Sequence, residues 1–477
     1  MIEPTGIIAI IFLIYMVGML GVGVWSSRKT HTAADFFLAN RSLGPWLTAI
    51  SATSSSESAW AVMGTVGMAY KQGLSAWWFL PGCLLGYALN WLFVGERLRK
   101  QALESGSLTI PDFLESNFKD PAKSIRILSA FIIFSCMVAY VAAQFTAAGK
   151  AFDAIFGIDQ YISIPMSALI IVFYTLLGGF LAVAWTDLVQ GLVMVGGLVA
   201  LSLVAFAEVG GFTELYQKTT LVSPDFLSLN GGKSGAAMWG GIIGLLGIGL
   251  GYPGQPHVLT RFMAARDSKT IRQGWRISLG WGFLVYFSGI LLGIFGKAIM
   301  PDLEDPEQLF PKIAIDLLHP IFSGIVLAAI LAAIMSTADS QLLVAASTVV
   351  RDIYEKVFSK SVSEKKMLVY SRVVIALLGI LAMAFALTDV RVIFWFVLFA
   401  WSGLGASFGP PILFILYWKK TTRQGILAGM GAGFLTTLVW KISGLSDSLV
   451  YELPPAFFVS CLAVFLVSRA TQHSAPS

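Results

Sequence analysis

The sequence predicts an all-α polytopic membrane protein, and three observations carry this prediction. Of its 477 residues, 56% are hydrophobic and only 12% are charged, whereas soluble domains carry about 25% charged residues. The mean hydropathy of +0.77 agrees with this class. Apolar runs of roughly 18–25 residues recur along the whole chain. They are too long and too uniformly apolar for barrel strands, so helices are expected.

The apolar runs number about thirteen. They lie near residues 5–26, 45–69, 74–95, 124–152, 161–184, 187–208, 236–256, 275–299, 318–347, 368–388, 392–418, 423–442 and 453–469. The first run has no basic flank and no small-residue cleavage site, so we interpret it as a retained span. Because no stretch is long enough for a separate soluble domain, one membrane domain is expected over residues 1–477.

The charges of the loops predict the orientation in the membrane. About three quarters of the 32 Lys and Arg residues fall in loops on one side of the thirteen expected spans, and Arg261 is among them. The other side holds the acidic stretch PDLEDPEQLF. Since basic loops stay in the cytoplasm, we expect the N-terminus outside and the C-terminus inside. The net charge of +5 then reflects topology, and no nucleic-acid partner is expected.

Two spans are interrupted by residues that disfavour a helix in lipid. The second span contains SATSSSESAW and the seventh contains GIGLGYPGQPH. In a helix interior Gly costs about 1 kcal/mol and Pro about 3 kcal/mol. Five spans separate the two interruptions, so the two spans cross the membrane in opposite directions.

This spacing predicts two inverted units of five helices, over residues 45–208 and 236–418, with residues 423–469 as peripheral helices. Interruptions at corresponding places of inverted halves indicate the binding site of a transporter. The alternative is that both interruptions serve only helix packing.

The ninth span carries a stripe of oxygen atoms. In ILAAIMSTADSQLL, the residues Ala333, Ser336, Thr337 and Ser340 recur at helical spacing and share one face. Two hydroxyls and nearby backbone carbonyls form a neutral oxygen cage, which suits a hard cation such as Na⁺. A polar seam between helices is the alternative.

Three carboxylates lie in or beside spans: Glu57, Asp187 and Asp339. A charge at mid-bilayer costs at least about 2.5–3.5 kcal/mol, so a partner or a function is expected. For each of these carboxylates there is a simpler interpretation that requires no function. Glu57 is then protonated and hydrogen-bonded to neighbouring serines, Asp187 caps the start of the sixth span, and Asp339 reaches cytoplasmic water.

Two tyrosines are candidate ligand contacts. Tyr140 lies in the fourth span, and Tyr252 lies between Gly251 and Pro253 in the interrupted seventh span. The irregular backbone beside Tyr252 leaves room for a ligand. Plain packing is the alternative for both rings.

Five segments together resemble the sodium:solute symporter family, and within it most closely the bacterial sodium/proline symporters. They are RSLGPWLTAISA, GGFLAVAWTDLVQG, GLGYPGQPHVLTRFMAA, LAAIMSTADSQLLV and AWSGLGASFGPPILF. The resemblance runs nearly end to end. It implies the LeuT-type inverted-repeat fold, with thirteen spans, an outside N-terminus and a place in the bacterial inner membrane.

The resemblance also implies the residues of the ion sites. The family's shared sodium site corresponds to Ser54, Glu57, Ala333, Ser336 and Thr337. A second ion site, present in some members, corresponds to Asp187, Asp339 and Ser340. Asp339 stands where such members have a serine.

The substrate site is implied in the same way. It corresponds to Tyr140, Glu57, Ile248, Tyr252, Gln255 and Pro256. This chain departs from the proline members at two positions, with Ser56 in place of an Asp and Ile248 in place of a Trp. Glu57 follows Ser56 and is rotated by about 100° around a helix.

The expected function is Na⁺-coupled uptake of a small organic solute, with proline or a related amino acid as the cargo. The alternatives are a monocarboxylate or pantothenate as cargo, an H⁺-coupled carrier, and a channel or sensor on the same fold. No HExxH or paired Asp/His set lies inside a span, so no enzyme is expected. The expected partners are Na⁺, the solute and the lipid bilayer, and a monomer suffices.

Overall fold

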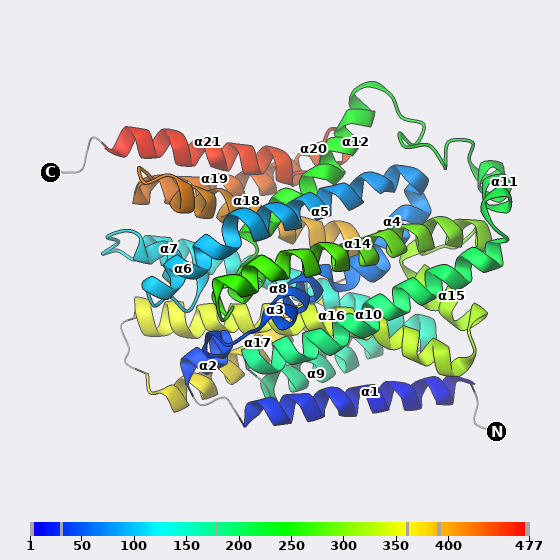
Figure 1. Ribbon diagram of the computed structural model, residues 1–477, viewed down its shortest axis with the longest axis horizontal. Helices are drawn as coiled ribbons and strands as arrows, with labels where there is room; N and C mark the ends of the chain where they lie inside the picture. Colours follow the sequence, from blue (N-terminus) through cyan, green and yellow to red (C-terminus); the bar gives the residue numbers. More distant parts are fainter. Residues whose placement is uncertain (1–3, 29–31, 178, 359–361, 389–392, 473–477) are drawn as a thin grey trace.

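The computed structural model describes residues 4–28, 32–177, 179–358, 362–388 and 393–472. Within these ranges the chain forms helices and no strand, apart from one isolated bridge between Leu43 and Ala265. The long helices lie side by side along the long axis of the molecule (Figure 1). The first helix begins at one end of this bundle and the last helix ends at the other. This arrangement is the one expected of an odd number of crossings.

Each predicted span corresponds to one or more helical elements. They are α1 (Pro4–Ser27), α3 (Pro45–Ala59) with η2 (Trp60–Gly64) and α4 (Thr65–Gln72), η3 (Gly73–Trp78) with α5 (Phe79–Leu89) and η4 (Asn90–Gly95), α8 (Ser124–Phe156), α9 (Gln160–Leu177), α10 (Phe180–Val209), α12 (Gly235–Gly247) with η5 (Ile248–Gly254) and α13 (Pro256–Met263), α14 (Ser268–Ile299), α16 (Pro320–Ser347), α17 (Glu364–Ala386), α18 (Ile393–Tyr417), α19 (Arg423–Ile442) and α21 (Leu453–Thr471).

By length and composition alone, 11 helices of the described residues are apolar enough to cross a membrane. One of them, Pro45–Glu104, is 60 residues long and covers two predicted spans. Its direction reverses at Gly73, where φ is +60°, and α5 then runs back along the bundle (Figure 1). The apolar stretch Gln160–Phe173 of α9 is shorter than the others. These two facts reconcile the 11 helices with the thirteen predicted segments.

The connecting segments contain short helices of their own. These are α2 (Ala33–Leu38), η1 (Ala39–Arg41), α6 (Glu96–Glu104), α7 (Ile110–Ser116), α11 (Phe212–Val222), η6 (Pro306–Gln308), α15 (Leu309–Leu317) and α20 (Leu445–Ser448). After the ninth span, η7 (Thr348–Val357) continues α16 without a break.

The first interruption lies at Ser58, whose φ of 34° and ψ of −170° leave the helical region. A positive φ is strained in any residue with a Cβ atom. The break also removes backbone hydrogen bonds, and Gln144 of α8 replaces one of them. Its Oε1 accepts from the backbone N–H of Ala59 at 3.1 Å. Since α8 is distant in sequence, Gln144 was not among the predicted residues.

The second interruption is the turn of η5 followed by Gln255, whose φ of −89° and ψ of 105° are extended. Pro256 then begins α13, a position where Pro fits because its missing N–H is not needed. The turn passes very close to α5. A Cβ atom at Gly249 would lie 2.2 Å from the carbonyl oxygen of Gly82, so only glycine allows this approach.

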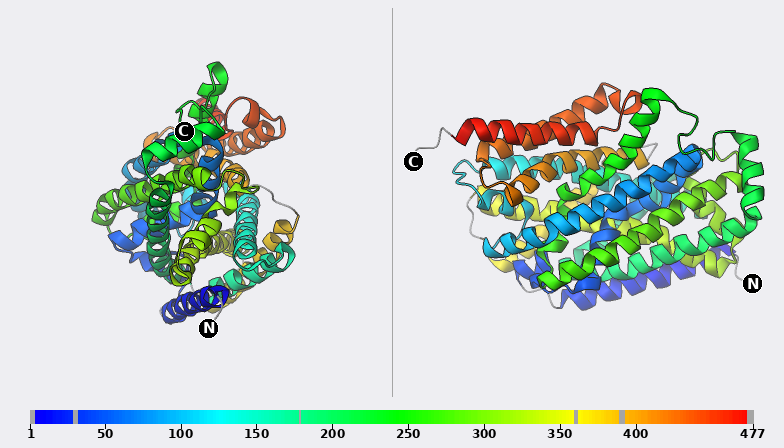
Figure 2. Two further views of the ribbon diagram at one scale, coloured as in Figure 1. Left: turned by 90° about the vertical axis from the view of Figure 1, so that its right-hand side faces the viewer. Right: turned by 45° about the horizontal axis from the view of Figure 1, so that its top comes forward.

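Helix α3, which carries the first interruption, packs against α10, α14 and α16, and α10 packs against α14 and α16. Figure 2 (left) shows many of the long helices end-on, with α1 at the periphery. The boundary between the fifth and sixth spans differs from the prediction. Because α10 begins at Phe180 after the N-cap residue Gly179, Asp187 lies inside the helix, and the alternative that it caps the sixth span is wrong.

Candidate functional site

Four of the five residues predicted for the sodium site converge between α3 and α16. The hydroxyl of Ser336 donates to the carbonyl oxygen of Ser54 at 3.2 Å and to that of Ala333 at 3.1 Å. The hydroxyl of Thr337 lies 3.5 Å from the same Ser54 oxygen. All four residues are buried. The contact joins the helix before the first interruption to the ninth predicted span.

These oxygens fit a small cation of single charge. Two carbonyls and two hydroxyls are neutral ligands of the kind that hard cations prefer. The Ser54 side-chain oxygen is also buried here and has no hydrogen-bond partner within the described part of the chain. A buried polar atom is normally satisfied, so an orphan at this point favours a bound group. Glu57, the fifth predicted ligand, directs its carboxylate elsewhere, and a role for its backbone carbonyl stays a prediction.

Gly191 of α10 packs against the Ser54 hydroxyl, which leads to a first prediction. A Cβ atom at Gly191 would lie 2.4 Å from the Ser54 side-chain oxygen and 2.9 Å from Ile50. We therefore expect Gly191→Ala to displace Ser54 and to raise the sodium concentration for half-maximal uptake about fivefold or more, equivalent to about 1 kcal/mol. On the same helix, Gly196→Ala is the matched control, since nothing lies within 4 Å of its added Cβ. Equal sodium dependence of the two variants would contradict the placement.

The residues predicted for a second ion site lie beside the first cluster, around an unpredicted arginine. Arg261 Nη2 lies 3.0 Å from Asp187 Oδ2 and also donates to the Ser340 hydroxyl. The Ser51 hydroxyl donates to the same Asp187 oxygen at 2.6 Å. The Ser340 hydroxyl lies 3.3 Å from Asp339 Oδ1. These five side chains come from α3, α10, α13 and α16, and all are buried.

Two expectations about this cluster are wrong. Arg261 was placed among the basic loop residues, but it lies in α13 with a side-chain exposure of 0%. Asp339 does not reach water in this structure, because its exposure is also 0%. The sequence signal for the burial of Arg261 was its position directly after the interrupted span. In the structure, the buried carboxylate of Asp187 supplies the opposite charge that permits a buried guanidinium.

Glu57 lies past the oxygen cluster and faces aromatic side chains. Its Oε1 accepts from the Tyr87 hydroxyl at 3.2 Å, and its Oε2 accepts from the Trp281 indole N–H at 3.2 Å. The Glu57 carboxylate is therefore hydrogen-bonded to Tyr87 and Trp281 instead of to the neighbouring serines. Tyr87 also lies 3.1 Å from the hydroxyl of Ser56, the residue where proline members have an Asp. The Tyr87 hydroxyl thus contacts both the Glu57 carboxylate and the Ser56 hydroxyl.

The aromatic rings next to Glu57 include one predicted residue, Tyr252, and one that was missed, Trp401. The centroids of the two rings lie 4.8 Å apart, and the Tyr252 hydroxyl lies 3.0 Å from that of Tyr286. Trp401 comes from α18, and its indole N–H donates to the Ile248 carbonyl at 3.1 Å. Gln255 Nε2 donates to the Trp401 carbonyl at 3.0 Å. Trp401 is part of the AWSGLGASFGPPILF segment, but no local pattern showed that it lies against the seventh span.

The remaining predicted substrate residues lie at the edge of this aromatic group. Pro256 is buried at the first position of α13. Tyr140 lies edge-on to His257 of α13, with the ring centroids 6.3 Å apart. Tyr140, Tyr252 and Pro256 are therefore grouped around the second interruption.

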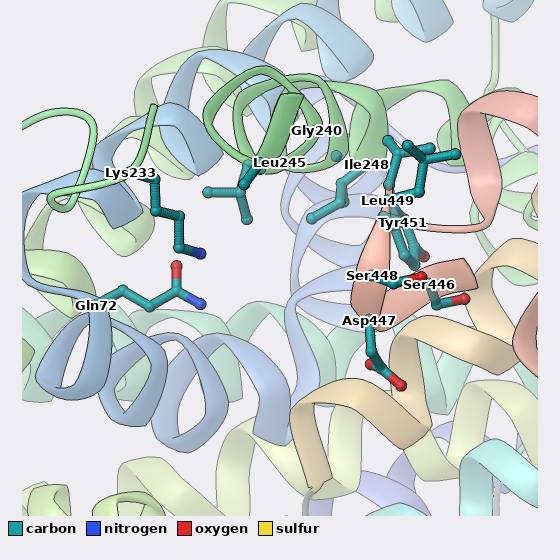
Figure 3. Close-up of a pocket in the computed structure, with 14 residues that line it drawn as sticks. Gln72, Lys233, Gly240, Leu245, Ile248, Ser446, Asp447, Ser448, Leu449 and Tyr451 are labelled. Carbon is teal, nitrogen blue, oxygen red and sulfur yellow. The ribbon is translucent and has the colours of Figure 1, made fainter. Parts of the chain in front are cut away.

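A cavity of about 280 Å³ approaches the aromatic group from one end of the molecule. Figure 3 shows Gln72 and Lys233 on one side of it and the segment from Ser446 to Tyr451 on the other. Ile248, whose carbonyl binds Trp401, lines the cavity wall. Ile248 thus links the cavity, through Trp401, to the ring of Tyr252.

Comparison with known proteins gives one consistent result. The model of the sodium:solute symporter family matches residues 36–433. The high-affinity proline transporter PutP of Bacillus subtilis is 41% identical, with 96% of this chain and 97% of the relative covered. The sodium/proline symporter of Salmonella typhimurium is 36% identical, with 96% and 92% covered.

Among solved structures, a Na⁺-coupled sialic acid symporter in a substrate-bound outward-open state matches with a TM-score of 0.79 at 20% identity, covering 98% of each chain. The nucleobase-cation-symport-1 family transporter Mhp1 matches with a TM-score of 0.55 at 13% identity, covering 92% of this chain and 95% of Mhp1. These likenesses confirm the predicted fold class. The match of the family model over residues 36–433, together with relatives that are 36–41% identical over nearly the whole chain, establishes that this chain belongs to the sodium:solute symporter family.

Proposed function

We propose that the protein takes up proline or a closely related amino acid together with Na⁺. The observation that carries the proposal is the contact of Ser54 with Ser336 and Thr337, which places neutral oxygens from α3 and α16 around one point. A sodium ion held there ties the two helices together. This linkage favours the state that binds the solute, and by reciprocity the solute tightens the binding of sodium.

The proposed solute site lies between Glu57 and the aromatic residues around Tyr252. The Glu57 carboxylate offers a partner to the ammonium group of an amino acid, and rings of this kind pack against a small apolar body. Proline members have a Trp at the position of Ile248. Trp401 supplies an indole from α18 at the same place, because it binds the Ile248 carbonyl and lies edge-on to Tyr252. Proline as cargo is therefore compatible with Ile248.

The relatives whose names contain proline support this choice of cargo, since they are 36–41% identical over nearly the whole chain. The membrane potential and the sodium gradient supply enough free energy to accumulate the solute. One Na⁺ crossing 100 mV releases about 2.3 kcal/mol, and a tenfold sodium gradient adds about 1.4 kcal/mol. Together these sustain accumulation of the solute by several hundredfold.

We propose that the N-terminus lies outside, the C-terminus lies in the cytoplasm, and the protein resides in the bacterial inner membrane as a functional monomer. The proposed inverted repeats are residues 45–208 and 236–418, with residues 423–469 peripheral to them. The distribution of basic loops supports this orientation. The cavity bounded by Gln72 and Lys233 then opens to the outside and forms the entry for the solute.

The test is uptake into proteoliposomes that contain the purified protein. We expect radiolabelled proline to accumulate when an inward sodium gradient and an inside-negative potential are imposed, and not when potassium replaces sodium. Pantothenate and a monocarboxylate serve as alternative cargoes. Uptake driven by a proton gradient alone, or flux without accumulation, would contradict the proposal.

A further inference from the structure

We propose that a second cavity, between α6, α7 and the end of α18, binds the headgroup of one phospholipid, phosphatidylethanolamine. The proposal goes beyond the proposed function, since it concerns neither the sodium ion nor the solute. The cavity has a volume of about 590 Å³, within the range of about 300–1,000 Å³ typical of small-ligand sites. Its lining includes Glu104, Ser105, Ser116, Asn117, Trp418 and Lys419. Figure 1 shows α6, α7 and the C-terminal end of α21 at the same end of the molecule.

Two aromatic residues at the end of α18 connect this cavity to the lipid-facing surface. The indole of Trp418 lines the cavity and stacks on Phe465 of α21, with the ring centroids 5.4 Å apart. The neighbouring Tyr417 donates its hydroxyl to the Phe93 carbonyl at 2.8 Å. Phe93, Tyr417 and Phe465 are all exposed, and exposed apolar side chains on membrane-spanning helices face lipid. A lipid that packs on these rings therefore has its headgroup next to the cavity.

Basic residues next to these rings mark the depth of the lipid headgroups. Arg97 follows Phe93 by four positions, and Arg469 follows Phe465 by four positions. Their guanidinium groups lie over the rings of Tyr417 and Phe465, at 4.2 Å and 5.6 Å from the ring centroids. Aromatic rings flanked by cations are typical of the boundary between hydrocarbon and headgroups. The cavity lies at this boundary, on the cytoplasmic side in the proposed orientation.

The charged residues of the cavity specify the chemistry of the headgroup. Lys419 supplies one cation and Glu104 supplies one carboxylate, and both side chains are exposed to solvent. Within the described part of the chain, neither forms an ion pair with the other or with a third residue. Ser116 and Asn117 add uncharged hydrogen-bond donors. A phosphate at Lys419 and these donors, with an ammonium at Glu104, satisfies both charges of the cavity.

Phosphatidylethanolamine is the phospholipid that matches this pair of charges. Its phosphate accepts hydrogen bonds from Lys419, and its primary ammonium donates hydrogen bonds to Glu104. Phosphatidylglycerol has no cation for Glu104. Phosphatidylcholine has a quaternary ammonium without any N–H group, so it forms no hydrogen bond with the carboxylate. The extra carboxylate of phosphatidylserine is repelled by Glu104.

The test is lipid binding to the purified full-length protein, measured by native mass spectrometry. The protein is titrated with phosphatidylethanolamine, phosphatidylcholine or phosphatidylglycerol that all carry the same acyl chains. We expect the first bound phosphatidylethanolamine to have an affinity about threefold to fivefold higher than either of the other lipids, as exposed ion pairs contribute modestly. Water-soluble phosphoethanolamine should not displace it at equal concentration, because the acyl chains add binding that the free headgroup lacks.

Two variants separate the charges of the headgroup. Glu104→Gln should lower the affinity for phosphatidylethanolamine to that for phosphatidylglycerol, whereas Lys419→Gln should lower the affinities for both lipids. Lys420→Gln is the matched control for the lysine, since Lys420 is the next residue and does not line the cavity. Glu208→Gln is the control for the carboxylate, because Glu208 lies near the end of α10, at the opposite end of the molecule (Figure 1). Both controls should bind lipid like the wild type.

Three results would overturn the proposal. The first is a wild type that binds the three lipids equally, and the second is wild-type selectivity in both Glu104→Gln and Lys419→Gln. The third is displacement by phosphoethanolamine at equal concentration, which would assign the cavity to a soluble ligand. The wild-type titration decides the question even if a variant does not fold. Because no transport is measured, failure here leaves the proposed uptake of sodium and proline untouched.

Discussion

Replacing Ser336 and Thr337 together by alanine is expected to raise the sodium concentration that gives half-maximal proline uptake by about tenfold or more. The double variant removes both hydroxyls that converge on the Ser54 carbonyl. A tenfold change corresponds to about 1.4 kcal/mol of lost binding free energy, a modest value for two ligands of a buried cation. The measurement is the initial rate of uptake as a function of sodium at fixed membrane potential.

Ser347 provides the control for this double variant. It lies at the end of the same helix, and its hydroxyl donates to the Val344 carbonyl within that helix at 2.8 Å. Ser347→Ala therefore removes a hydroxyl from α16 without touching Ser54, and its sodium dependence should equal that of the wild type. If the double variant also kept the wild-type dependence, the sodium site would have to lie elsewhere.

Tyr252→Ala is expected to weaken proline binding by about tenfold or more at saturating sodium. The ring of Tyr252 lies 4.5 Å from that of Tyr87 and 4.8 Å from that of Trp401, measured between centroids, so its removal opens the centre of the aromatic group. Truncation of a large buried ring typically costs about 3–5 kcal/mol in a packed interior, and part of that loss falls on the ligand. Equilibrium binding of radiolabelled proline in high sodium measures this loss directly.

Tyr252→Phe separates the ring from its hydroxyl. This variant keeps the ring contacts with Tyr87 and Trp401 and loses the hydroxyl, which lies 3.0 Å from that of Tyr286. We expect its proline affinity to fall by no more than about fivefold, in line with the loss of one hydrogen bond. Wild-type proline affinity in the alanine variant would exclude Tyr252 from the solute site. A loss in the phenylalanine variant equal to that in alanine would assign the effect to the hydroxyl.

The spans and the two interruptions were predictable because their causes are local. A run of apolar residues must satisfy its backbone within itself in lipid, and this requires a helix wherever the run lies. Glycine, proline and serine disturb a helix through their own backbone and side-chain chemistry. The breaks at Ser58 and in η5 therefore follow from short stretches of sequence. The oxygen stripe of Ala333, Ser336 and Thr337 follows from helical spacing alone.

Other residues of the site were not predictable, because their partners are distant in the chain. Gln144 binds the broken backbone at Ala59, 85 positions away. Trp401 meets Ile248 across 153 positions. A glutamine or a tryptophan within a span is equally compatible with plain packing. The segment around Gln144 or Trp401 does not show which helix its side chain faces.

The sequence was enough to predict the helical membrane class, the places where two spans break and the oxygen-bearing residues of the ninth span, since each depends on neighbours within a few residues. The packing of separate helices instead placed Arg261 in a buried pair with Asp187 and turned the Glu57 carboxylate toward Tyr87 and Trp281. The physical reason is that a buried charge is tolerated only beside a suitable partner, and packing of separate helices determines where that partner lies.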